Sequence, residues 1–348
     1  MTTLQPSAQS RSARLAAVAG SGQFLRLLAR IREAGLLIAL AAIVVIVTVQ
    51  APRFLQISNL RQILLSVSIL AIVAVGQTLV VLTRNVDLSV ASSVGLVAYV
   101  VRDLLRDHPD IGIPAAIAAG LLIGALLGAI NGALVTIGGV PAIVATLGTL
   151  YVYRGVVFAI GGGELITASE VPQGFRDIAL SRPWGIPTPI IVAAAVALVF
   201  AYLLRSTRFG RELYAVGSSP EAARLVGLSV GRRVFTAFVL CGLLCGLAGV
   251  LWGARFGSID ARAATGIELQ VIAAVVLGGV NIFGGSGTVL GAVLGAILLG
   301  TIQNALIILR LNQFWLQAIS GAAILLAVTA DALITRRVRR SLVVRLRR

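Results

Sequence analysis

Long uncharged stretches recur along this chain, and no other feature constrains its fold as strongly. Hydrophobic residues make up 58% of the sequence and charged residues only 12%, which is far from the composition of a soluble domain. The pattern predicts an all-α polytopic membrane protein with about ten transmembrane helices. The predicted spans are residues 35–51, 62–83, 88–101, 111–137, 141–161, 187–204, 234–254, 269–283, 289–309 and 311–333.

The basic residues predict how these spans are oriented. All 29 are arginine, and 18 of them lie in three zones, at residues 11–32, 205–233 and 336–348. Positive residues concentrate on the cytoplasmic side of a membrane, so we expect both termini and the 205–233 loop to face the cytoplasm. The net charge of +16 then reflects topology in a lipid bilayer, and nucleic-acid binding is not expected.

This topology divides the chain into three parts. Residues 1–34 form a cytoplasmic amino-terminal segment, residues 35–333 form the transmembrane domain with its coupling loop at 205–233, and residues 334–348 form a basic cytoplasmic tail.

An internal repeat supports the same layout. Residues 126–134 match residues 298–306 at six of nine positions, an offset of 172. At that offset, span 62–83 aligns with 234–254. Paired spans are then five apart in chain order, so the two five-helix halves have opposite orientations. Inverted repeats of this kind are typical of transporters, whose pathways lie where helices are interrupted.

Two such interruptions carry polar or glycine-rich sequence, at residues 83–89 and 278–287. In the first, Asp87 or Asn85 is suited to cap the next helix. The segment is either a polar lining along which a sugar's hydroxyl groups pass, or a tight cytoplasmic turn. The candidate pathway residues are Gln77, Asn85, Asp87, Ser89, Thr146 and Asn281.

A short capped helix is predicted in the 205–233 loop. Ser219 suits the cap, Pro220 the first helical position, and Gly227 the stop. Its small apolar face either docks into a groove of a partner protein or belongs to an ordinary loop helix. That face consists of Ala222, Ala223, Leu225 and Val226, and the candidate coupling residues are Ser219, Pro220, Glu221, Ala222, Ala223, Arg224 and Gly227.

Several kinds of site are excluded or unsupported. The chain contains no lysine, so it has no phosphate-binding P-loop, and any ATP must be hydrolysed by another polypeptide. We therefore expect a transport subunit that is not an enzyme and binds no cofactor.

The lone His108 predicts no metal site, and Cys241 and Cys245 are expected to pack without a disulfide. Arg154 either snorkels to the outer face or is buried and paired.

The chain resembles a known family over nearly its whole length. The segments that carry the resemblance are Gly76–Ser89, Pro141–Gly155 and Val276–Gly287. They are similar to the permease subunits of bacterial ATP-binding-cassette importers for ribose, rhamnose, xylose and autoinducer-2. Glu221, Ala223 and Gly227 have the spacing of the coupling-loop signature of importer permeases. Residues 166–172 and 283–287 look most like rhamnose-type permeases, with autoinducer-2 next.

The resemblance implies the partners and the mechanism. The chain would pair with a second copy or a paralogue, with an ATP-binding subunit at the cytoplasmic face, and with a periplasmic sugar-binding protein. ATP binding would pull on residues 219–227 and switch the pathway between its two openings. The alternatives are an ion-coupled secondary transporter, which needs carboxylates within the membrane such as Asp87, Glu268 or Asp331, and a passive channel.

Overall fold

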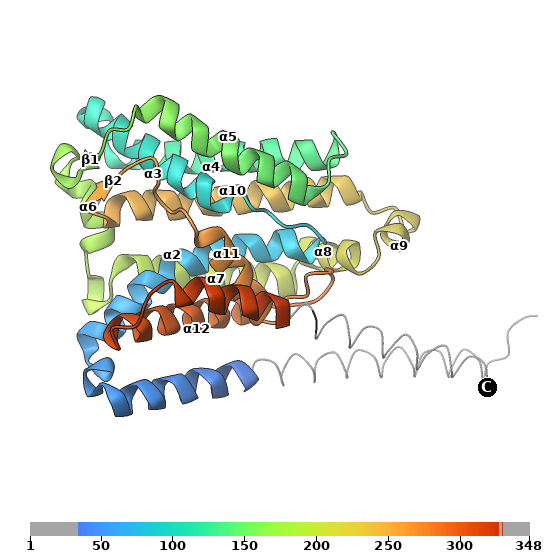
Figure 1. The fold of residues 1–348 in the computed structure, drawn as a ribbon. Coiled ribbons are helices and arrows are strands. Elements are labelled where there is room, and N and C mark those ends of the chain that lie inside the picture. The colour runs from blue at the N-terminus through green and yellow to red at the C-terminus, as the bar shows by residue number, and fades with distance from the viewer. Residues whose placement is uncertain (1–33, 327–328, 330–348) are drawn as a thin grey trace, which may run out of the picture.

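The computed structural model describes residues 34–326 and residue 329. Nearly all of this part is helical (Figure 1). The first and last described helices are Ala34–Gln50 and Trp315–Leu326. The long helices between them are α2 (Ile57–Leu82), α3 (Val90–Asp107), α4 (Ile113–Thr136), α5 (Ala142–Gly161), α7 (Thr188–Ser206), α10 (Val230–Arg255) and α12 (Val289–Ile308).

Shorter elements connect these helices. They are the helices α6 (Gln173–Leu180), α8 (Arg208–Ser218), α9 (Pro220–Leu225) and α11 (Ile267–Leu277), the 3-10 turns η1 (Pro52–Leu55), η2 (Pro109–Ile111), η3 (Ala168–Glu170) and η4 (Pro183–Gly185), and the strands β1 (Ile166–Thr167) and β2 (Ser258–Ile259). The two strands pair antiparallel.

Every predicted span overlaps a helix of the described part of the chain. Six of these helices, α2, α4, α5, α7, α10 and α12, are long and apolar enough to cross a membrane. The predicted third span was too short, because α3 runs on to Asp107 through a charged last turn. The predicted eighth span was too long, since α11 ends at Leu277. The architecture is that of an all-α polytopic membrane protein.

The core is built around α2 and α10. The apolar parts of these two helices are mostly buried, whereas α4, α5 and α7 keep most of theirs exposed, as expected for helices that face lipid. Helices α4 and α10 cross at close range because glycines meet. A Cβ atom on Gly124 would lie 2.4 Å from the carbonyl oxygen of Gly242. Small residues allow this approach of two membrane helices.

The two ends of the molecule differ. One end carries α8 and α9, and the other carries the β1–β2 pair and α6 (Figure 1). At the second end Arg102, fully buried, donates to the carbonyl oxygens of Ile166 at 2.8 Å and Phe256 at 2.9 Å. This side chain joins β1 to the carboxyl end of α10, and it satisfies backbone acceptors that would otherwise be buried without partners.

Candidate coupling and translocation sites

Helix α9 has the caps that its sequence predicts. The Ser219 hydroxyl accepts a hydrogen bond from the Ala222 amide at 3.2 Å. At the other end Gly227 has a left-handed backbone, with φ of 81°, and the Leu228 amide donates to the Ala223 carbonyl at 3.0 Å. This is the Schellman arrangement, which ends a helix by satisfying its last carbonyls. The helix is therefore a preformed structure that projects at one end of the molecule (Figure 1).

The exposed face of α9 differs from the predicted one. Leu225 and Val226 are 89% and 75% exposed, and Ala222 is exposed as well. Ala223 is 3% exposed and packs in the main hydrophobic core, so the expectation that it belongs to the docking face is wrong. The reason is the helical period. A short helix that packs against the protein must point some of its side chains at it, and in α9 the buried side chain is that of Ala223.

The acid at the start of α9 is stabilised as a carboxylate. A hydrogen bond from its own backbone amide, reinforced by the Ser219 hydroxyl and by the charges of Arg84 and Arg224, holds the pKa of Glu221 below its usual range. A negative side chain in the first turn also interacts favourably with the helix dipole. The exposed surface of α9 thus combines two large apolar side chains with an ionised carboxylate.

A second helix, α8, supports α9, and the sequence analysis missed it because it treated residues 205–218 as loop. Glu212 is buried on α8 and pairs with Arg208 at 2.7 Å and with Arg233, in the first turn of α10. The hydrogen bond from Arg208 and the charge of Arg233 hold the pKa of Glu212 below its usual range. This ion-pair network fastens α8 to α10. The i, i+4 spacing of Arg208 and Glu212 was the sequence signal for the helix.

The first interruption forms a buried polar network around Asp87, which is 2% exposed. Its Oδ1 accepts hydrogen bonds from the Ser89 amide at 2.9 Å and the Ser89 hydroxyl at 2.7 Å. Asn131 of α4 adds bonds from its Nδ2 to Ser89 Oγ at 2.7 Å and to Asp87 Oδ2 at 3.4 Å. Asp87 therefore orients Ser89, the residue before α3, deep inside the protein, but its carboxylate accepts from Ser89 and does not cap α3 as predicted.

Asn131 connects this network to α5. Its Oδ1 accepts from the Thr149 hydroxyl at 2.7 Å and from the Tyr153 hydroxyl at 3.4 Å. Asn131 lies five residues before the end of α4, about 8 Å from the α4–α5 turn at 1.5 Å per residue. Sequence reasoning missed Asn131, Thr149 and Tyr153 as site residues. The available signal was an asparagine in an otherwise apolar span.

Two further candidate residues contact the same loop. Gln77, fully buried on α2, faces both backbone groups of Asp87; with its amide oxygen turned to the Asp87 N–H and its nitrogen to the Asp87 carbonyl, it makes bonds of 3.1 and 3.2 Å. Thr146 of α5 donates to the Val86 carbonyl at 3.2 Å. The structure therefore brings together Gln77, Asp87, Ser89 and Thr146, from two helices and the loop between α2 and α3.

The other two candidates lie apart from this network. The Asn85 side chain bonds to the carbonyl and hydroxyl oxygens of Thr83, at 2.9 and 3.0 Å. In the second interruption, Asn281 Oδ1 accepts from the Phe283 amide at 2.8 Å. Each asparagine stabilises its own turn, which is a common role for this residue type.

Arg154 is held by the backbone and does not snorkel. Its Nη1 donates to the carbonyl oxygens of Ala261 and Ala263, at 2.8 and 2.7 Å. It therefore secures the segment between β2 and α11 from within α5.

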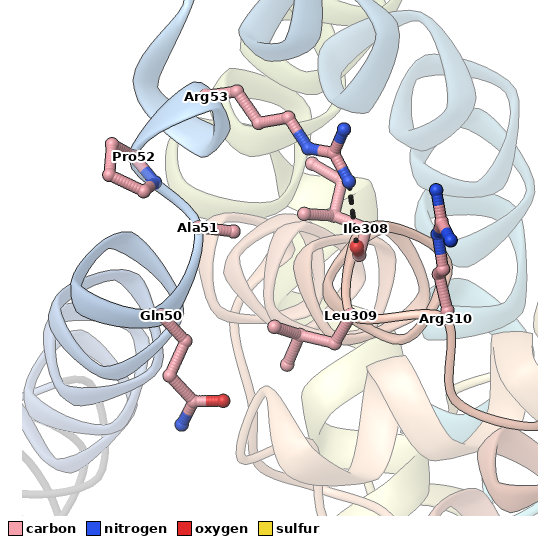
Figure 2. A pocket seen from close by; sticks show the side chains of 7 residues that line it. All are labelled: Gln50, Ala51, Pro52, Arg53, Ile308, Leu309 and Arg310. Carbon is pink, nitrogen blue, oxygen red and sulfur yellow. Dashed lines mark hydrogen bonds between the residues drawn. The ribbon is translucent and has the colours of Figure 1, made fainter.

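A hollow of about 460 Å³ lies at the end of the molecule opposite α9. Arg53 crosses it and donates to the Ile308 carbonyl at 3.3 Å, as Figure 2 shows. Arg310 lies beside that contact with a left-handed backbone, φ 56°. The lining residues are Gln50, Ala51, Pro52, Arg53, Ile308, Leu309 and Arg310. The hollow marks where the turn after the first described helix meets the end of α12.

Comparison with known proteins identifies the family. Residues 59–328 match the family described as "Branched-chain amino acid transport system / permease component". The ribose import permease protein RbsC of Escherichia coli (strain K12) is 38% identical over 85% of this chain and 92% of its own. The autoinducer 2 import system permease protein LsrC of Salmonella typhi is 36% identical over 86% of this chain and 85% of its own. No solved structure matches. Because the match covers most of its length, the chain belongs to this family of transport-system permease components.

Proposed function

We propose that this chain is the membrane permease subunit of an ATP-driven importer of a monosaccharide or of autoinducer 2. The observation that carries the proposal is the 38% identity to a ribose import permease along 85% of the chain. Residues 166–172 and 283–287 favour a rhamnose-like sugar or autoinducer 2 among the candidate substrates.

The proposed topology has ten spans in two inverted repeats, with both termini in the cytoplasm. The helix bounds support the repeat, because α10 begins and ends 173 residues after α2. The direction of the helices supports the inversion, since α2 runs toward the end that carries α9 and α10 runs away from it (Figure 1). In addition, α4 packs on α10 and α12 packs on α2, which is the pairing that a two-fold relation between halves requires.

In this proposal α9 docks on the separate ATP-binding subunit. Leu225 and Val226 supply an exposed apolar anchor of the kind that fills a groove on a partner. The remaining partners are a periplasmic sugar-binding protein, and a second copy or a paralogue of this chain. ATP is used by the ATP-binding subunit, and this chain acts as a transport subunit without enzymatic activity of its own.

The proposed pathway passes the first interruption. Gln77, Asp87, Ser89 and Thr146 place amide, carboxylate and hydroxyl groups inside an apolar bundle, and Asn131 joins them to α5. Polar groups at such depth are costly and usually serve transport. Asn85 and Asn281, which brace the neighbouring turns, position the two interruptions.

An uptake experiment in cells separates this function from ion-coupled transport, which the buried Asp87 would otherwise suit. The chain's own gene is deleted, and uptake of radiolabelled ribose, rhamnose and autoinducer 2 is measured before and after. We expect loss of uptake of one of these solutes. In the parent strain that uptake should stop on ATP depletion and continue when a protonophore collapses the proton gradient. Uptake that follows the proton gradient instead would contradict the proposal.

A further inference from the structure

The carboxyl end of α8 leads directly into α9, and the Arg84 side chain, from the first interruption, forms hydrogen bonds to it. Arg84 Nε donates to the Gly217 carbonyl and Arg84 Nη2 donates to the Ser218 carbonyl, both at 2.6 Å. The last carbonyls of a helix have no partner within it and carry partial negative charge. A planar guanidinium with forked donors suits two adjacent carbonyls better than an ammonium group does.

The backbone of Arg84 shows that this position is constrained. Its φ is 67°, in the left-handed region that residues other than glycine seldom occupy. Arg84 is the residue that ends α2 in a Schellman turn, in which the Arg84 amide donates to the Val81 carbonyl at 3.0 Å and the Asn85 amide to the Val80 carbonyl at 3.3 Å.

The second interruption, residues 278–287, also contacts the ends of α2 and α8. The Gly285 amide donates to the Leu82 carbonyl at 3.0 Å, and the Tyr214 hydroxyl of α8 donates to the Gly287 carbonyl at 2.8 Å. A Cβ atom on Gly217 would lie 1.8 Å from the Leu82 carbonyl oxygen and 2.5 Å from the Gly285 nitrogen. The end of α2, the end of α8 and the glycine-rich turn are therefore in direct backbone contact, with no room for a side chain between them.

We propose that Arg84 is a positioning residue that transmits movement of α9 to both interruptions at once. The inference rests on the proposed function. When the ATP-binding subunit displaces α9, residues 217 and 218 move with it, and the forked hydrogen bonds carry Arg84 along. Arg84 is three residues before Asp87, so the displacement reaches the buried network through a very short segment. The backbone contact at Gly285 moves the glycine-rich turn in the same direction.

The test uses the complete importer in proteoliposomes and measures two rates, sugar uptake and ATP hydrolysis. Arg84→Ala should leave ATP hydrolysis within about two-fold of wild type and lower the uptake per ATP by about ten-fold. Arg84→Lys should recover part of that ratio, because an ammonium group reaches one carbonyl at a time. The matched control is Arg310→Ala, which removes an arginine of similar backbone conformation, φ 56°, at the opposite end of the molecule, and should keep the wild-type ratio.

The inference is overturned if Arg84→Ala keeps the wild-type ratio, or if uptake and hydrolysis fall together in an intact complex. Absence of ATP-dependent uptake by the wild-type complex would refute the proposed function itself. Hydrogen exchange on the purified full chain then still tests the mechanical link. Arg84→Ala should speed amide exchange in residues 217–222 and 281–287 together. Faster exchange in only one of these segments contradicts the inference.

Discussion

At the scale of single residues, several arginines outside the proposed cytoplasmic zones, among them Arg102, Arg154 and Arg255, donate to backbone carbonyls. Arg102 bonds to the Ile166 and Phe256 carbonyls, and Arg255 bonds to the Leu65 carbonyl at 2.7 Å. A guanidinium in an apolar bundle is costly unless its donors are satisfied, and the irregular segments between helices offer free carbonyls. Arg102 thereby secures the non-helical segments at Ile166 and Phe256, whereas Arg255 joins the end of α10 to Leu65 of α2.

The Asp87 network gives the first residue-scale prediction. Asn131→Leu removes the group that joins Asp87 to Thr149, and it leaves buried polar atoms short of partners. Each unsatisfied group costs about 1–3 kcal/mol, so we expect a clear fall in the melting temperature of the purified protein. The matched control is Thr136→Val, because the Thr136 hydroxyl bonds only within its own helix, to the Gly132 carbonyl at 2.7 Å. Equal melting temperatures for the two variants would refute this account.

At the scale of elements, α8 and α9 form one unit that is fastened to the rest of the protein at two points of α8. Arg84 holds the carboxyl end of α8, and Glu212 fastens the middle of α8 to Arg233 of α10. After these attachments along the chain, α9 exposes Leu225 and Val226. A helix of six residues is too short to be stable alone, so its caps and these neighbours keep it folded in the absence of a partner.

The ion pairs of Glu212 predict a pH dependence. Its pKa is lowered in the folded protein, so its contribution to stability is complete above the unfolded value, about 4.3, and is lost as the pH falls through the lower folded pKa. Glu212→Gln should therefore lower the melting temperature at pH 7, and the difference from wild type should shrink as the pH falls below about 4.3. Glu164→Gln, in an exposed pair with Arg106, should change little at any pH. A difference for Glu212→Gln that is constant with pH would contradict the assignment.

The exposed face of α9 predicts the site of docking. Leu225→Asp and Val226→Asp each place a charge on the proposed anchor without disturbing the core. Both variants should reach the membrane at normal levels and lose co-purification with the ATP-binding subunit. Trp184→Asp alters a residue that is equally exposed, at 89%, on another loop, and should keep the complex intact. Retention of the ATP-binding subunit by both α9 variants would exclude this surface.

At the scale of the whole molecule, the two interruptions meet where α2 and α8 end. Span positions were predictable from hydrophobicity, and the α9 caps from local residue preferences, because both depend on neighbours in the sequence. The roles of Asn131 and Arg84 were not predictable, since their partners lie on other helices. Ala223 was wrongly predicted to lie on the exposed face of α9, because the face that points inward depends on how the helix packs against the rest of the protein.

The proposed topology gives a whole-molecule prediction. With both termini and the 205–233 loop in the cytoplasm, reporter fusions after Arg233 and after Arg348 should both report an inside location. A fusion within residues 162–186, at the opposite end, should report outside. An outside signal at either arginine would rule out ten spans with this orientation.

Reconstitution tests the central claim most directly. The purified chain is placed in proteoliposomes, with and without its ATP-binding subunit and sugar-binding protein, and uptake of labelled sugar is measured with no ion gradient. We predict uptake only when both partners and ATP are present, and no ATP hydrolysis by the chain alone. Uptake by the chain alone, or uptake with both partners present but without ATP, would contradict the account.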